Sequence, residues 1–148
     1  MSSERSPQPR ESQTPREPVG LADTSVFIAR ESGRPIGSLP RRVSVSVVTV
    51  GELQLGVLAA TDRETRARRA GTLALARRSD PIAISEAVMA GWAQLTHACV
   101  AAGIARKVRL MDALIAATAL EHGLAVVTQD DDFDLIAEAH PPLDVIKV

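Results

Sequence analysis

The chain has 148 residues, a formal net charge of −1 and one cysteine, Cys99. This length suits one domain with its own hydrophobic core, and a lone cysteine excludes an internal disulfide and fits a reducing cytoplasm. Aromatic residues make up only 2% of the chain, so base stacking on an aromatic platform is not expected as the main mode of nucleic-acid recognition. No segment has the apolar length of a membrane span, and the start of the chain lacks the apolar core of a signal peptide.

The first 18 residues differ in composition from the rest of the chain. They read MSSERSPQPRESQTPREP and contain no aliphatic residue after Met1. Such a segment cannot bury enough apolar surface to offset the entropy that ordering costs. We therefore predict a disordered N-terminal extension over residues 1–18 and one folded domain over residues 19–148.

The folded part opens with alternating strand and helix signals. VGLA, which ends at Asp23, is a short apolar run typical of a buried strand, and residues 24–30 predict the first helix. Residues 41–48, RRVSVSVV, alternate and are β-branched, so they predict a second strand. Thr49 is then expected to cap a helix, with Glu52 as its capping-box partner.

The next part of the chain predicts two further helices around a short strand. Asp62 begins an Arg-rich helix, which we expect to present a solvated face. PIAI at residues 81–84 predicts a third strand. Ser85 is placed to cap a helix from about residue 86 to residue 102, and Gly103 is a natural stop.

The last third of the chain continues the alternation. MDALIAATALEH predicts an Ala-rich buried helix, LAVVT a buried strand, QDDDFDLIAEA a loop with a short helix, and PPLDVIKV a last strand. We therefore predict the α/β class, with a central, mostly parallel sheet flanked by helices on both faces. Right-handed crossovers place the carboxyl ends of the strands at one edge, where sites form in such folds.

Four acids fall where this architecture brings the chain together, and they are Asp23, Glu52, Asp112 and Asp130. Two follow strands, and two lie near predicted helix starts. Mg²⁺ and Mn²⁺ prefer hard oxygen ligands, and a metal ion held by carboxylates lowers the pKa of a bound water and offsets charge on a phosphate. Singly, each acid also fits a helix cap or a solvated loop. A near-neutral chain is unusual for a nucleic-acid binder, but a bound cation inverts the local charge.

Four segments of the chain resemble, in the same order, the signature segments of PIN-domain nucleases. They are LADTSVF, VTVGELQLGV, RLMDALIAATALEHGLAVVT and TQDDDFD. Within that family, the resemblance is closest to the VapC-like toxins. The resemblance covers roughly residues 20–148. It implies a PIN-like fold and an endoribonuclease with a pocket for Mg²⁺ or Mn²⁺ that cleaves single-stranded or structured RNA. It also implies a homodimer that acts as the toxin of a type II toxin–antitoxin system, with a cognate antitoxin as partner.

Carried over by position, Asp23 and Asp112 match the family's first and third acids, which are metal ligands. Glu52 matches the second acid and Asp130 the fourth. The fourth assignment competes with the neighbouring aspartates Asp131, Asp132 and Asp134. The hydroxyl residues that match family positions beside the acids are Thr24, Ser25 and Thr128, for which capping and turn hydrogen bonds are the alternative role.

Members of this family usually begin just before the first strand. Residues 1–18 are therefore surplus to the resemblance, and translation from Val19 is a hypothesis that would account for them.

The basic residues just before Asp112 are a candidate path for RNA. Arg106, Lys107 and Arg109 are placed to contact phosphates, and a solvated connector is the alternative.

Two other functions stay open at this point. A haloacid-dehalogenase-like phosphatase also places an Asp after its first strand, but its opening motif has a second Asp two residues later, where this chain has Ser25. A non-catalytic PIN-like interaction module would not need the complete set of acids.

Overall fold

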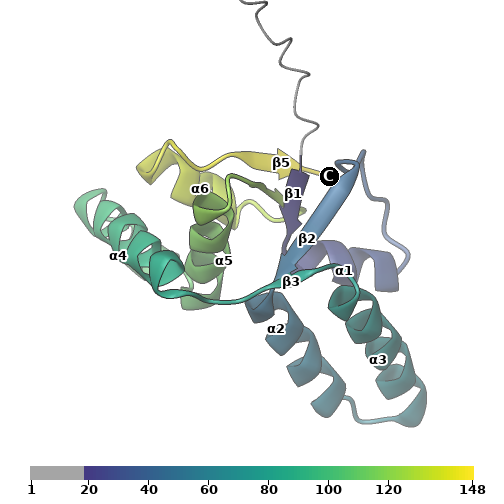
Figure 1. Cartoon of the computed structure of the whole chain (residues 1–148). Helices are drawn as coiled ribbons and strands as arrows, with labels where there is room; N and C mark the ends of the chain where they lie inside the picture. The colour runs from purple at the N-terminus through teal and green to yellow at the C-terminus, as the bar shows by residue number, and fades with distance from the viewer. Residues whose placement is uncertain (1–18) are drawn as a thin grey trace, which may run out of the picture.

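The computed structural model describes residues 19–148, so the predicted disorder of residues 1–18 lies outside the described residues. Five parallel strands form one sheet in the order β3-β2-β1-β4-β5 (Figure 1). The strands are β1 (Val19–Ala22), β2 (Arg42–Ser46), β3 (Pro81–Ile82), β4 (Ala125–Thr128) and β5 (Val145–Lys147). The predicted α/β class with a parallel sheet is confirmed.

Helices cover both faces of the sheet (Figure 1). One face carries α1 (Thr24–Glu31), α2 (Val47–Leu58) and α3 (Arg63–Arg77). The other carries α4 (Glu86–Ala101), α5 (Leu110–Glu121) and α6 (Asp132–Ala139), with the short 3₁₀ helix η1 (Ala105–Lys107) between α4 and α5. No helix within residues 19–148 is both long and apolar enough to cross a membrane.

The two cores follow from the alternation of side chains along the strands. Leu21 and Val126 point into the core beneath α4, α5 and α6, whereas Ala22 and Val127 point into the core beneath α1, α2 and α3. All four are almost completely buried. Since strands β1 and β4 are apolar on both faces, they lie in the middle of the sheet.

The boundary between β2 and α2 differs from the prediction. The strand ends at Ser46, which caps α2 by accepting a hydrogen bond from the amide of Val48 at 3.1 Å. Thr49 therefore lies inside the helix, fully buried, and its hydroxyl has no hydrogen-bond partner. The predicted capping box of Thr49 and Glu52 is wrong. The strand propensity of this β-branched run is overridden because Val48 and Val50 pack onto the two cores from a helix.

Other local predictions are confirmed with small shifts of boundary. Asp62 caps α3 by accepting from the amide of Thr65 at 2.8 Å, and Ser85 caps α4 by accepting from the amide of Val88 at 3.1 Å. Gly103 ends that region at a φ of 73°, which favours glycine. Cys99 is buried, in line with the prediction from the sequence.

Candidate active site

Asp23 lies at the carboxyl edge of the sheet, directly after β1 and beside the end of β4. Its side chain is almost completely buried, with 3% of the residue exposed. One carboxylate oxygen accepts hydrogen bonds from the amide and the hydroxyl of Ser25, at 2.6 and 2.5 Å. The other oxygen accepts a hydrogen bond from the hydroxyl of Thr128 at 2.9 Å. Two of the three predicted hydroxyl residues, Ser25 and Thr128, therefore hold the first acid.

Burial raises the pKa of Asp23, because the carboxylate loses water that would stabilise its charge. The hydrogen bonds from Ser25 and Thr128 act in the opposite direction, and the negative charge of Asp130 raises the pKa further. A cation bound at this edge would lower the pKa of Asp23 and so oppose the effects of burial and of the Asp130 charge.

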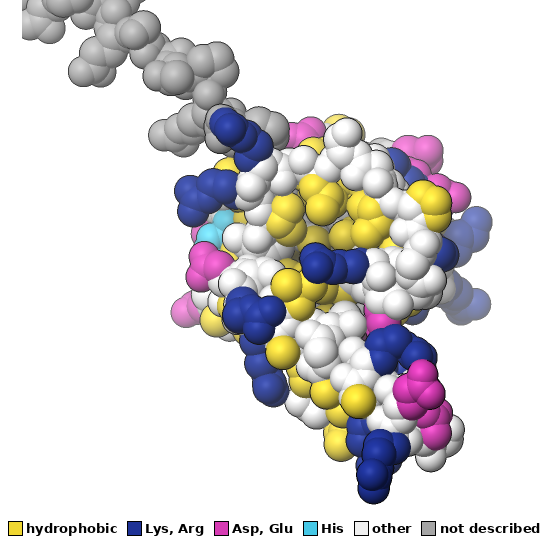
Figure 2. All heavy atoms as spheres, turned by 90° about the vertical axis from the view of Figure 1, so that its right-hand side faces the viewer, with side chains coloured by type: hydrophobic (Ala, Val, Ile, Leu, Met, Phe, Trp, Pro, Cys, Tyr) yellow, Lys and Arg dark blue, Asp and Glu magenta, His cyan; other side chains and the backbone are white. Residues whose placement is uncertain are grey.

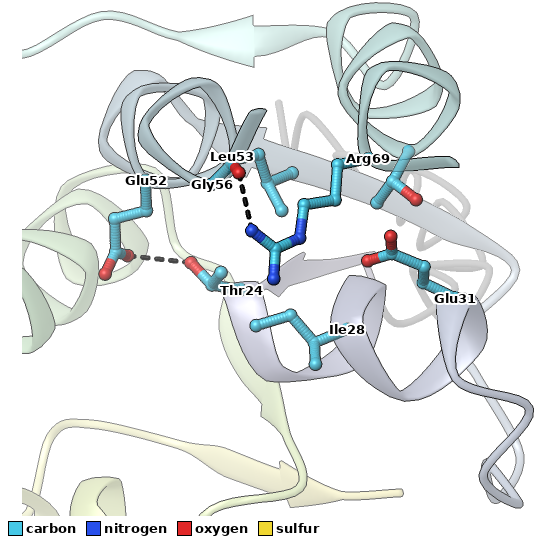
Figure 3. A pocket seen from close by; sticks show the side chains of 8 residues that line it. Thr24, Ile28, Glu31, Glu52, Leu53, Gly56 and Arg69 are labelled. Carbon is cyan, nitrogen blue, oxygen red and sulfur yellow. Dashed lines mark hydrogen bonds between the residues drawn. The ribbon is translucent and has the colours of Figure 1, made fainter. Parts of the chain in front are cut away.

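Glu52 is brought to Asp23 by a contact between helices. The hydroxyl of Thr24, the residue after Asp23, donates to Glu52 Oε1 at 2.7 Å (Figure 3). This bond joins the first residue of α1 to the middle of α2, 28 residues apart. The second acid is thus oriented by the first helix instead of by a capping box.

Asp112 lies in the first turn of α5 and is 4% exposed. Both of its carboxylate oxygens accept hydrogen bonds from Arg109, from Nε at 3.0 Å and from a terminal guanidinium nitrogen at 3.2 Å. These bonds raise the pKa of Arg109, and the negative charges of Glu52 and Asp132 raise it further. Arg109 therefore lies among acids and is bound to one of them, a contact that the phosphate-binding prediction did not include.

Asp130 follows β4 by two residues and belongs to the same edge. Its backbone amide donates to the hydroxyl of Thr128 at 3.0 Å, and its charge acts on Asp23. Thr128 therefore connects the first and fourth predicted acids through one hydroxyl group.

The comparison with known proteins shows the family of this chain. Residues 21–139 match the family model of the PIN domain. The chain belongs to the PIN-domain family. It is 65% identical over 101 residues to Ribonuclease VapC8 of Mycobacterium tuberculosis, an alignment that covers 68% of this chain and 90% of the relative. It is 46% identical over 130 residues to Ribonuclease VapC4 of the same species, covering 86% and 95%.

A solved structure gives the same fold for this PIN domain. The crystal structure of VapBC-5 from Mycobacterium tuberculosis, described as a member of the VapBC family of toxin-antitoxin systems, has a chain that superposes with a TM-score of 0.76. The two chains share 37% sequence identity, and the match covers 88% of this chain and 98% of the other. The predicted resemblance to PIN domains of the VapC group is therefore confirmed.

The acids of this PIN domain suit a hard cation, but their side chains do not form a ready-made cage. Within residues 19–148, no group of three or more His, Cys, Asp or Glu side chains is arranged to hold a metal ion. Asp23 and Asp130 are connected through the hydroxyl of Thr128, whereas Asp112 is bound to Arg109, whose guanidinium also feels the charge of Glu52. The carboxylate oxygens are ligands that Mg²⁺ and Mn²⁺ prefer. A shared ion at Asp112 would have to compete with the guanidinium.

A pocket of about 200 Å³ lies between α1, α2 and α3, and Glu52 is the one predicted acid that lines it. Figure 3 shows Thr24 and Glu52 at one end, Glu31 at the other, and the Arg69 side chain between them, bound to the carbonyl of Gly56. Glu31 Oε1 is buried without a hydrogen-bond partner and lies 3.5 Å from Nε of Arg68. The sequence analysis missed Glu31, since an acid in the last turn of a helix has no distinctive pattern.

The arginines of α3 are not simply the solvated face that the sequence predicted. Arg69 donates to the backbone carbonyl of Gly56 at 2.7 Å, and Arg66 donates to that of Ala60 at 3.0 Å. Both bonds fasten α3 to the end of α2. On the face shown in Figure 2, Lys and Arg side chains are scattered around a group of hydrophobic side chains instead of forming one basic patch.

Proposed function

We propose that this PIN domain is a Mg²⁺-dependent endoribonuclease that acts as the toxin of a type II toxin–antitoxin system. The observation that carries the proposal is the buried carboxylate of Asp23, held by three hydrogen bonds at the sheet edge beside Asp130. Relatives named Ribonuclease VapC support the activity, and the similar VapBC-5 structure supports an antitoxin as partner.

Asp23 and Asp112 are the residues that would hold Mg²⁺, with Mn²⁺ as an alternative, and Glu52 and Asp130 would complete the acidic site. When bound, the cation supplies a water of lowered pKa and offsets the charge that develops on the scissile phosphate. The protein's part is positioning. Ser25 donates to Asp23 and so favours its ionised form, which is the form that binds a cation.

The orientation of Glu52 has a similar origin. Because Thr24 donates to one carboxylate oxygen of Glu52, the other oxygen stays available to a ligand. Arg109 neutralises the charge of Asp112, a role that a bound cation would share. The chain's own hydrogen bonds thus orient Asp23 and Glu52, and a bound cation would have to draw the remaining acids together.

RNA, either single-stranded or structured, is the proposed substrate. Arg106 and Lys107 lie in η1, are exposed, and come just before the helix that carries Asp112. Cations at that place would reduce the repulsion between RNA phosphates and the acids. Arg109 is a weaker candidate for a phosphate contact than the sequence suggested, because its guanidinium binds Asp112.

The test is RNA cleavage by the purified chain with Mg²⁺ and with EDTA, alongside Asp23→Asn and Asp112→Asn. We expect cleavage by wild type only with the metal and none by either variant. Both variants should fold, since removing a charge from a crowded acidic site relieves repulsion. Full cleavage by a variant would refute the site. Hydrolysis of a small phosphomonoester would favour the phosphatase, and a folded, metal-binding but inactive wild type would favour the interaction module.

A further inference from the structure

Lys147, the last residue of β5, binds the loop that carries the fourth predicted acid. Its ammonium group donates to the backbone carbonyl of Asp130 at 2.7 Å and to the carboxylate of Asp134 at 3.1 Å. It also forms an ion pair with the carboxylate of Asp131. The contacts cross from the edge strand of the sheet to the loop after β4 and the first turn of α6, 13 to 17 residues away.

The peptide groups of Asp130 are therefore held on both sides. Its amide donates to the hydroxyl of Thr128, and its carbonyl accepts from Lys147. The same Thr128 hydroxyl donates to Asp23. A continuous set of hydrogen bonds thus runs from Lys147 through the backbone of Asp130 to the most buried acid, so the position of Asp130 relative to Asp23 depends on Lys147.

Lys147 also separates the crowded aspartates into two kinds. Asp131 and Asp134 pair with its ammonium, and this pairing lowers the pKa of Asp131. Asp130 accepts a hydrogen bond from Lys147 only at its backbone carbonyl. The carboxylate of Asp130 is therefore not paired with Lys147, and its negative charge acts on Asp23. The choice of Asp130 among its neighbours thus has a physical basis that the sequence did not provide.

An ammonium group has three N–H donors, and these three oxygens account for all of them. A direct contact between Lys147 and an RNA phosphate would require one of these bonds to break. The geometry therefore favours a role in shaping the protein over a role in holding the substrate.

We propose that Lys147 is a further positioning residue of the acidic site: it fixes the loop after β4 so that Asp130, and not Asp131 or Asp134, faces Asp23 and completes the cation site. This inference rests on the proposed function. It assigns the role to a residue of the edge strand, in none of the segments on which the family resemblance was based.

The experiment compares wild type with Lys147→Met, Lys147→Arg and a control, Arg78→Met. The control also removes one cation, from an exposed residue at the end of α3. Binding of Mn²⁺ is measured on the full chain without RNA, by electron paramagnetic resonance of the free ion. Cleavage of RNA is measured at saturating Mn²⁺ to separate kcat from KM, and circular dichroism checks the fold.

We expect Lys147→Met to weaken Mn²⁺ binding by roughly 10-fold or more, the usual effect of losing a group that orients metal ligands. Its kcat should fall while its KM for RNA stays near the wild-type value, because the substrate contacts are intact. Lys147→Arg should recover part of both losses, and Arg78→Met should match wild type. If Lys147→Met does not fold, Lys147→Gln keeps a donor for the carbonyl of Asp130 and should show a smaller loss of the same kind.

Unchanged Mn²⁺ affinity in a folded Lys147→Met protein would overturn the inference. A raised KM with unchanged kcat and metal affinity would also overturn it, and would assign Lys147 to RNA binding. Both results leave the proposed nuclease function standing. A wild-type chain that binds no Mn²⁺ and cleaves no RNA would instead refute the proposed function, and this inference with it.

Discussion

Replacing Thr128 by valine removes one hydroxyl from the centre of the site and keeps the shape of the side chain. That hydroxyl donates to Asp23 Oδ2 at 2.9 Å, accepts from the amide of Asp130 at 3.0 Å, and lies in a fully buried residue. A hydrogen bond to a charged group contributes about 1.5–3 kcal/mol, and a neutral one about 1 kcal/mol. Because the variant no longer buries a hydroxyl, part of this loss is offset, and we expect a net loss of about 2–3 kcal/mol.

For a chain of this length, such a loss lowers Tm by roughly 5–10 °C. The matched control is Thr118→Val. Thr118 is equally buried, but its hydroxyl donates at 2.8 Å to the carbonyl of Leu114, four residues earlier in its own helix. That carbonyl keeps its helical hydrogen bond, so the control should lose less than about 1 kcal/mol.

The loss should also depend on pH in a defined direction. Burial raises the pKa of Asp23 above the ordinary value of 3.8, and the hydrogen bond from Thr128 lowers it, so Thr128→Val raises it further. Well below pH 3.8 Asp23 is protonated in both proteins, folded and unfolded, and the difference in stability between them is smallest. The difference in unfolding free energy between wild type and Thr128→Val increases as pH rises through the raised pKa of Asp23, because only the ionised carboxylate depends on the hydrogen bond that the variant lacks.

The assay is urea unfolding at several pH values in EDTA, together with RNA cleavage at neutral pH. Thr128→Ser should restore most of the stability, since it keeps the hydroxyl and loses one methyl group, worth about 0.8 kcal/mol. Cleavage by Thr128→Val should fall because neither Asp23 nor Asp130 keeps its orienting bond. A loss equal to that of Thr118→Val, constant across pH, would refute the reasoning.

Three further predictions concern the surface and the cell. The double change of Arg106 and Lys107 to Ala should raise KM for RNA more than it lowers kcat. It should also reduce the slope of log binding constant against log salt concentration by roughly 0.7 per lost phosphate contact. Unchanged RNA binding in a folded variant would show that these residues do not contact RNA. Arg109→Met frees both oxygens of Asp112, so Mn²⁺ should bind more tightly in a titration, and weaker binding would contradict this. Expression of the chain alone should arrest growth, the Asp112→Asn variant should not, and the co-expressed antitoxin should rescue growth.

The fifth prediction is a homodimer, which the family resemblance implies. Apolar side chains remain exposed on α4 and at the start of α5, and a shared interface would bury them. Light scattering at micromolar concentration measures the mass, and a monomer there would rule the dimer out.

The sequence alone determined the order of the elements, the parallel sheet and the edge at which the acids lie. These features depend on local signals: the apolar runs of β1 and β4, the caps at Asp62 and Ser85, and the turn at Gly103. Because Asp23 and Asp130 follow strands and Asp112 opens a helix, their positions in the fold could be predicted from the order of strands and helices. Glu52 was the exception, since its helix begins earlier than the pattern indicated.

The tertiary structure alone decided which groups orient the acids. Thr24 meets Glu52 across 28 residues, and Thr128 meets Asp23 across 105. Local propensity carries no information about such partners, since they depend on how separate elements pack. The bond between Arg109 and Asp112 spans only three residues, so helical spacing could have revealed it. The loop contacts of Lys147 became visible only with β5 beside β4, because the pairing of those strands brings a distant ammonium to the aspartates.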